Sequence, residues 1–456
     1  MSDQPELSDL ERTVFAPLQK TGIGFWAVLA ALGALVLWGA LAYAVQLRDG
    51  LGVTGLDRPV YWGIYLTNFV FFTGISMAGT LISAILRVTR AGWRRSITRI
   101  AEAVTAFALM LGALQILIDM GRVDRLLNVL VFGRFQSPML WDFTCIGAYF
   151  LSSVFYLYLP MIPDMARLRD KWTDAPASKT PRFLRGWRRG LYRALALDWR
   201  GTAEQFRRLE KLIAVMAIVL IPTAALVHTV VSWLFGMTLE PMWHSTIFGP
   251  YFIVGAIFSG IALLFIFMTL LRRAWHLENY IGDKQYNYLG LLLLAMSAFW
   301  IYFTLAENLT TFYGAVADEM NVDAAKLLGS FSPLFWGMIV LNAMVPFSIL
   351  VWRRGRTPIG TFVVSVSVVI GMWLERFLIV IPSLTRPRVA FAIGVYQPTL
   401  TEVAITVGSF ALLALLYLAF FKFFPVMAMW EVEETVGSGQ WIVSSDQEPA
   451  LQPSVH

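Results

Sequence analysis

The chain has 456 residues, of which 57% are hydrophobic and only 14% are charged, and its mean hydropathy is +0.64. These values exclude a soluble globular protein and indicate an integral membrane protein. The single cysteine, Cys145, excludes an internal disulfide and also any iron–sulfur cluster or structural zinc site built from thiolates of this chain alone. The net charge of +6 does not require a nucleic-acid partner, because the basic residues follow the membrane topology described below.

Ten apolar stretches are long enough to cross a bilayer core of about 30 Å as helices. The apolar runs are unbroken rather than alternating, which favours a helical bundle over a barrel. The sequence therefore predicts an all-α integral membrane protein. Its ten predicted spans lie near residues 22–46, 61–87, 98–119, 138–162, 211–235, 246–271, 287–313, 330–352, 358–382 and 402–424.

The basic residues are unevenly distributed between the two sides of these spans. An even number of spans places both termini on one side, and most of the 36 Lys and Arg residues lie there, above all in the connection 163–210. The positive-inside rule then predicts cytoplasmic termini in the inner membrane of a bacterium. We expect the basic connection to meet anionic lipid headgroups, with a dedicated partner site as the alternative.

Two short motifs recur along the chain, SPMLW at 137–141 with SPLFW at 332–336, and GISMAG at 74–79 with GAIFSG at 255–260. They predict two similarly oriented four-helix bundles with two peripheral helices, although a chance match of short apolar strings remains an alternative. Serine can cap a helix start, and proline is tolerated at the first helical position. We expect the paired glycines to allow close helix packing.

The predicted divisions of the chain follow from this duplication. They are a cytoplasmic N-terminal segment (1–21), a peripheral helix with an external loop (22–60), the first bundle (61–235), the second bundle (236–382), an external loop with the last peripheral helix (383–424) and a cytoplasmic tail (425–456).

Two carboxylates stand out because a charged group in the hydrocarbon region is costly unless it is paired, hydrated or neutralised. Asp119 ends the third predicted span, and Asp142 lies one turn inside the fourth, on the same side of the membrane. The two carboxylates can therefore face one cavity near the external surface, where they could accept protons. The alternative for Asp119 is an interfacial ion pair with Arg122.

Further ionisable residues lie inside the predicted spans, and they could form a proton route. For one of them, His228, a packing role bonded to the backbone is equally compatible with the sequence. For the neighbours Glu375 and Arg376, a structural pair or contact is the simpler interpretation. The candidates for the route are Glu102, His228, Glu307, Glu375 and Arg376.

The histidines argue against a b-type haem. Of the four histidines, only His228 and His244 fall in the same half of the membrane, so a pair of axial ligands at one depth is not expected. We therefore expect neither haem nor an iron–sulfur cluster nor another metal bound by this chain.

Four sequence stretches resemble the NrfD/PsrC family of membrane subunits, namely SPMLWD at 137–142, LPMIPD at 159–164, YWGIYLTN at 61–68 and PMWHSTIFGPYF at 241–252. Within it, the chain is most similar to the ten-helix quinol-binding subunit of alternative complex III, over about residues 20–425. The resemblance implies a haem-free subunit that exchanges electrons between a menaquinone or ubiquinone pool and a periplasmic iron–sulfur protein. It also implies multihaem cytochrome or molybdopterin-type partners, other membrane subunits, and proton routes through the two bundles.

The resemblance maps a quinol site onto Asp142 and the stretch 119–122, although Asp119 stands where relatives commonly carry histidine. Quinol oxidation needs a base near water and an apolar cleft for the tail. We expect Asp142 to be the principal proton acceptor, Asp119 its partner and Arg122 the residue that orients them. The remaining candidates for contact with the quinone are Trp141, Tyr61, Trp62, Asn68 and Ser137. Alternatives are a secondary transporter and a passive membrane anchor.

Overall fold

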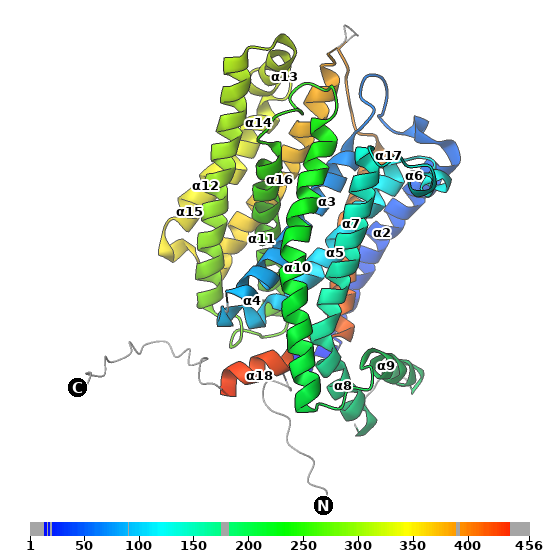
Figure 1. The fold of residues 1–456 in the computed structure, drawn as a ribbon, viewed down its shortest axis with the longest axis vertical. Coiled ribbons are helices and arrows are strands. Elements are labelled where there is room, and N and C mark those ends of the chain that lie inside the picture. The colour runs from blue at the N-terminus through cyan, green and yellow to red at the C-terminus, as the bar shows by residue number, and fades with distance from the viewer. Residues whose placement is uncertain are drawn as a thin grey trace, which may run out of the picture.

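The computed structural model describes residues 13–15, 17–18, 21–89, 91–174, 182–388 and 393–437. Within these residues the fold is all-α, without a β-strand, and ten helices are long and apolar enough to cross a membrane (Figure 1). The predictions of an all-α fold and of ten spans are confirmed. The spans are Ile23–Asp49, Ile64–Val88, Thr98–Asp119, Pro138–Asp170, Ala203–Gly236, Phe248–Ala274, Asp283–Gly314, Ser332–Leu350, Pro358–Thr385 and Leu400–Phe423.

Most of these spans are single helices. They are α2 (Ile23–Asp49), α5 (Thr98–Asp119), α10 (Ala203–Gly236), α11 (Phe248–Ala274), α12 (Asp283–Gly314), α16 (Pro358–Thr385) and α17 (Leu400–Phe423). The others combine α3 (Ile64–Thr80) with α4 (Leu86–Val88), α7 (Pro138–Tyr158) with α8 (Ile162–Asp174), and α14 (Ser332–Ile339) with α15 (Val345–Leu350). The first and third of these combinations are joined by π-helical segments at Leu81–Ile85 and Val340–Met344.

Shorter helices mark the two ends of the bundle. One end carries α6 (Asn128–Val131) and α13 (Ala317–Leu327), and we call it the α13 end. The opposite end, the α18 end, carries α8, α9 (Arg182–Leu195) and α18 (Met429–Gly437) (Figure 1). The connection predicted at 163–210 is therefore largely helical in its described part. It ends where Thr202 and Gln205 form a capping box that starts α10 at Ala203, eight residues before the predicted start.

The long helices pack in two groups. In the first group α3 contacts α5, α5 contacts α7 and α7 contacts α10, and in the second group α11 contacts α12 and α16, and α14 contacts α16. The helices α3 and α11 join the groups, and α2 packs along α17. These contacts are compatible with two four-helix bundles and two peripheral helices, while the internal duplication stays a prediction.

The Ser-Pro helix starts differ in part from the expectation. Pro138 does occupy the first turn of α7, but the Ser137 hydroxyl makes no capping hydrogen bond. In the second copy the Ser332 hydroxyl and the Trp336 indole both donate to Leu327 O, at 2.9 and 3.1 Å. There the motif joins the start of α14 to the last residue of α13 instead of capping free amides, because the serine lies inside the helix.

The expected packing role of the repeated glycines is confirmed at Gly79. A Cβ on Gly79 would overlap Ala101 O and Thr105 Oγ1 of α5. This glycine therefore allows a close approach of α3 to α5 that alanine would prevent. A Cβ on Gly255 would instead lie 2.5 Å from the end of the flexible Arg376 side chain of α16.

Candidate functional site

Two carboxylates at the α13 end have buried oxygens that bond to nothing among the described residues. Asp142 is only 5% exposed, and its Oδ1 has no hydrogen-bond partner. The Oδ1 of Asp119, at the C-terminal end of α5, is also buried and without a partner. A buried unsatisfied carboxylate oxygen is costly, so it marks a place for a proton, a water molecule or a ligand.

The structure does not bring these two carboxylates into contact with each other. Among the described residues, no hydrogen bond joins Asp119 to Asp142, and the acid within electrostatic reach of Asp119 is Glu402 of α17. Arg122 does not orient them either, because its guanidinium donates two hydrogen bonds to Asp124, at 3.0 Å each, on the exposed surface. Among the described residues, the alternative ion pair of Asp119 with Arg122 is not formed. A cavity shared by Asp119 and Asp142 stays a prediction.

The surroundings of Asp119 are polar and come from α2, α3 and α17. The Tyr65 hydroxyl lies within electrostatic reach of Asp119 and donates to Gln46 Oε1 at 2.6 Å, and Gln46 Nε2 donates to Ile118 O at 2.9 Å. Glu402 accepts a hydrogen bond of 2.6 Å from the Tyr396 hydroxyl. The sequence reasoning missed this network, although an acid at the first position of the span predicted at 402–424 was a visible signal.

The aromatic candidates for the cleft lie at or near the surface. The side chains of Tyr61 and Trp62 are 59% and 39% exposed, and Trp62 stacks on Trp243 with ring centroids 6.0 Å apart. Trp141 is partly buried, and its indole donates to Phe135 O in the loop before α7. Tyr61 and Trp62 precede α3, and Trp141 lies in the first turn of α7.

Asn68 lies in the interior of the helix bundle. It is fully buried, and its amide nitrogen donates to Thr406 Oγ1 at 2.9 Å, while its oxygen accepts from the Trp373 indole at 2.9 Å. A longer bond of 3.4 Å reaches Gln115. These contacts connect α3 to α5, α16 and α17, so packing accounts for all of them.

A second polar group lies between the two helix groups. His228 of α10 places Nδ1 2.8 Å from Ala224 O and Nε2 3.1 Å from Thr73 O, so both ring nitrogens face carbonyl acceptors. A neutral imidazole can donate to only one of them. Arg376 of α16 lies within electrostatic reach of His228.

The neighbours Glu375 and Arg376 form an ion pair of 2.9 Å, both at 2% exposure. The second oxygen of Glu375 accepts a hydrogen bond of 2.9 Å from the Trp300 indole, and the Arg376 guanidinium lies 4.8 Å from the centre of the Phe252 ring. The structural pair considered in the sequence analysis is therefore present.

Glu375 also lines a cavity of about 50 Å³ in the second helix group, which reaches Glu307 and Lys326 near the α13 end. Glu307 accepts a hydrogen bond of 2.7 Å from Ser245. Burial lowers the pKa of the Lys326 ammonium, and the nearby carboxyls of Asp323 and Glu307 oppose that shift. The cavity brings together two carboxylates, an amine and hydroxyl groups, which is a set that can exchange protons through water.

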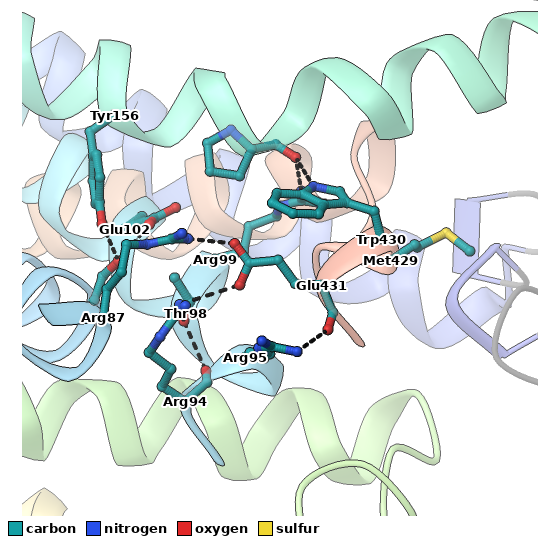
Figure 2. Close-up of polar contacts among 12 residues, drawn as sticks. Arg87, Arg94, Arg95, Thr98, Arg99, Glu102, Tyr156, Met429, Trp430 and Glu431 are labelled. Atoms are coloured by element: carbon teal, nitrogen blue, oxygen red, sulfur yellow. Dashed lines mark hydrogen bonds and ion pairs between the residues drawn. The ribbon is translucent and has the colours of Figure 1, made fainter. Parts of the chain in front are cut away.

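At the α18 end, Glu431 of the short helix α18 binds a cluster of arginines (Figure 2). Its carboxylate forms ion pairs with Arg87 and with Arg94, the latter at 3.2 Å. Burial acts to raise the pKa of Glu431, but the two arginines outweigh burial and lower it. Arg99 pairs with Asp164 at 2.6 Å close by, and both side chains are almost completely buried. The sequence analysis did not single out Arg99, although it lies inside a predicted span.

Glu102 lies beside this cluster. It is 3% exposed and accepts a hydrogen bond of 2.6 Å from Ser83, while its Oε2 has no partner among the described residues (Figure 2). Of the predicted route residues, the structure thus groups His228 with Arg376 and Glu375, connects Glu375 to Glu307 through the cavity, and leaves Glu102 at the opposite end.

No group of three or more His, Cys, Asp or Glu side chains that could hold a metal occurs among the described residues. The absence of a metal, a haem or an iron–sulfur cluster from this chain stays a prediction. The described acid and base groups can accept and release protons.

The geometry can be compared with known proteins. Residues 52–388 match the family model for polysulphide reductase, NrfD. The chain belongs to the NrfD family. This match confirms the resemblance found in the sequence at the level of the family, and together with the ten helices it identifies a multi-pass integral membrane protein. The narrower likeness to alternative complex III stays a prediction.

Three curated relatives are similar to the chain. A putative dimethyl sulfoxide reductase membrane subunit of Halobacterium salinarum is 28% identical, over 91% of this chain and 94% of the relative. A selenate reductase subunit of Mesobacillus selenatarsenatis is 25% identical, over 89% and 96%. The Hdr-like menaquinol oxidoreductase integral membrane subunit of Archaeoglobus fulgidus is 23% identical, over 92% and 98%. Each match spans nearly the full length of both chains.

Proposed function

We propose that this NrfD-family chain is the quinone-interacting membrane subunit of a respiratory redox complex. It oxidises quinol near the α13 end, and the electrons leave to an iron–sulfur subunit bound on the periplasmic face. Family membership and the relative named as a menaquinol oxidoreductase subunit support this function. The observation that carries the proposal is the buried, unpartnered Oδ1 of Asp142, one turn inside α7.

A bound quinol supplies two electrons and two protons. The protons need bases at the site, because a charged group left in an apolar pocket is costly. Asp142 accepts one proton at its free oxygen. Asp119 accepts the second proton and passes it toward the network of Glu402 and Tyr65, since both groups lie within electrostatic reach of Asp119.

The complex also moves protons across the membrane in this proposal. Glu102, His228, Glu307 and the pair of Glu375 with Arg376 are the groups assigned to that task. Their burial and their position in both helix groups support the assignment. Either menaquinone or ubiquinone fits the acid–base groups of the proposed site. The proposal also places both termini in the cytoplasm of a bacterium.

The partners in this proposal are membrane and periplasmic subunits, as in alternative complex III. They include the iron–sulfur protein together with a multihaem cytochrome or a molybdopterin-type subunit. The apolar side chains exposed at the α13 end between α5 and α7 support a covered surface there, since Phe132 and Phe135 are 76% and 80% exposed. Purification in a mild detergent tests this part of the proposal, because a solitary chain without redox subunits contradicts it.

Replacement of Asp142 by asparagine tests the site. We expect quinol-dependent reduction of the iron–sulfur partner to fall by about 10²–10⁴-fold, because the amide keeps the shape but accepts no proton at neutral pH. Asp124→Asn is the matched control, since that acid lies in the same region but is exposed and bonded to Arg122. Full turnover by an assembled Asp142→Asn complex removes Asp142 from the mechanism and favours a passive anchor.

A further inference from the structure

Helix α3 and the π-helical segment that follows it carry four hydroxyl side chains along one face. Thr73, Ser76, Thr80 and Ser83 follow one another at spacings of three, four and three residues, which places them in one row on a helix. All four are at most 2% exposed. A buried hydroxyl inside an apolar helix is costly unless it is bonded. Thr73 Oγ1 has no partner among the described residues, whereas the other three hydroxyls are bonded, and their partners indicate what the row does.

The row begins at the α18 end with Glu102. Ser83 donates to Glu102 Oε1 at 2.6 Å and lies 3.3 Å from the Tyr156 hydroxyl (Figure 2). The other oxygen of Glu102 is buried and has no partner among the described residues, although the carboxylate is 3% exposed. An unpartnered carboxylate oxygen next to a hydroxyl can receive a proton and transfer it to that hydroxyl.

The middle of the row continues through α7. The Thr80 and Tyr149 hydroxyls share a hydrogen bond of 2.7 Å, and Tyr149 also lies 3.2 Å from Ser76 O. The Ser76 hydroxyl donates to Thr73 O at 2.6 Å, and the same carbonyl faces His228 Nε2 at 3.1 Å. Hydrogen bonds among the described residues thus join Glu102 to Ser83 and Thr80 to Tyr149, and Ser76 and His228 meet at the same carbonyl, Thr73 O. Three residues along one helix face separate Thr80 from Ser83.

Beyond His228 the polar groups belong to the second helix group. Arg376 is within electrostatic reach of His228 and pairs with Glu375 at 2.9 Å. Glu375 lines the cavity of about 50 Å³ that extends to Glu307 and Lys326. Tyr251 and Thr304, which are 2.9 Å apart, line the same cavity. Its volume is sufficient for a few water molecules, at about 10–15 Å³ each.

We propose that these groups form one proton path that starts in the first helix group and ends in the second. The path runs from Glu102 along Ser83, Thr80, Tyr149 and Ser76 to His228. It crosses to Glu375 through water, because Arg376 does not relay a proton, and leaves through the cavity past Glu307 and Lys326. This path deepens the proposed function, because it assumes that quinol oxidation drives the protons. The two helix groups therefore do not each carry a separate route.

Proton transfer along the path changes no covalent bond between heavy atoms. Each hydroxyl accepts a proton on its oxygen and releases its own hydrogen to the next group, so every group returns to its starting form. At the end of the row nearer to His228, the Ser76 hydroxyl turns from Thr73 O toward the His228 imidazole. Arg376 is a positioning residue, because a guanidinium does not lose its proton in proteins and instead holds Glu375 in place.

A test for one path uses the complete complex in sealed liposomes. Proton movement per quinol oxidised is measured for Thr80→Val, Glu307→Gln and the double variant. Valine keeps the shape of Thr80 but removes its hydroxyl. We expect each single variant to lower the number of protons moved through the path per quinol oxidised by about tenfold or more. The double variant should be no worse than either single one, because both block the same path. Thr223→Val is the control, since that hydroxyl of α10 donates to Val219 O of its own helix, away from the path.

Turnover with a proton ionophore present separates this proposal from the proposed function. We expect ionophore-treated Thr80→Val and Glu307→Gln complexes to oxidise quinol within about twofold of the unmodified rate, because they keep the acids of the quinol site. Two parallel routes are indicated if each single variant lowers translocation by about half and the double variant abolishes it, and that result overturns the single path. Unchanged translocation in both variants, or an unmodified complex that releases only the quinol protons, overturns it as well.

Discussion

At the residue scale, the chain separates two kinds of buried polar group. Asn68 is fully bonded and connects four helices, whereas Asp142 and Glu102 each keep a buried oxygen without a partner among the described residues. Bonded groups stabilise packing, and unsatisfied carboxylate oxygens mark places where protons or ligands bind. This distinction identifies functional candidates better than burial alone.

Glu431 gives a residue-scale prediction about pH. Its lowered pKa means that docking of α18 is stabilised above about pH 4.5, the ordinary value, and that this contribution is lost as the pH falls through the lowered value. Glu431→Gln leaves Arg87 and Arg94 without their carboxylate partner. This substitution destabilises the docked state of α18 by about 3 kcal/mol. The change corresponds to about a 100-fold loss of hydrogen-exchange protection in residues 429–437.

The exchange rate of each amide, divided by its intrinsic exchange rate at the same pH, measures this effect. Glu433→Gln is the control on the same helix, because Glu433 pairs with Arg167 at 2.7 Å on a partly exposed surface where an ion pair contributes about 0–1 kcal/mol. Equal loss of protection in both variants contradicts the assignment of α18 docking to Glu431.

At the element scale, α2 depends on one close crossing. Only Gly39 and Gln46 of α2 are buried, and a Cβ on Gly408 of α17 would lie 2.9 Å from Gly39 Cα. Two glycine backbones in direct contact leave no space for a side chain. The position of α2 therefore depends on two small residues and the Gln46 hydrogen bonds.

Replacement of Gly408 by leucine is expected to separate α2 from α17. Overpacking at such a contact costs about 1–3 kcal/mol, so hydrogen exchange in residues 23–49 should become faster by about 5- to 150-fold. Gly33→Leu is the matched control, because nothing lies within 4 Å of a Cβ at that position of α2. Unchanged exchange in Gly408→Leu contradicts a packing role for this crossing.

At the scale of the whole molecule, charge determines orientation. The α18 end carries the arginine cluster around Glu431 and the helix α9, whereas the opposite end carries the buried acids Asp119 and Asp142. An excess of arginine on one side favours the cytoplasm for that side. The quinol site proposed for the α13 end then faces the periplasm.

Single cysteines test this orientation in a Cys145→Ser background. Arg193→Cys lies on α9 and Asn321→Cys on α13, and both positions are exposed. In right-side-out membrane vesicles, a membrane-impermeant maleimide should label position 321 and leave position 193 unlabelled, and inside-out vesicles should reverse the result. The opposite labelling pattern contradicts cytoplasmic termini.

The sequence by itself determined the ten spans, the all-α fold and the family, because the length and apolar character of a span are local properties of the chain. It also identified Asp142, Glu102 and Glu375 as intramembrane groups. Only the tertiary structure decided which of these groups meet. Asp119 lies within electrostatic reach of Glu402, and Arg87 binds Glu431 across 344 residues of sequence. Contacts between helices depend on the rotation of each helix about its axis and on where the helices cross, which no single apolar stretch encodes.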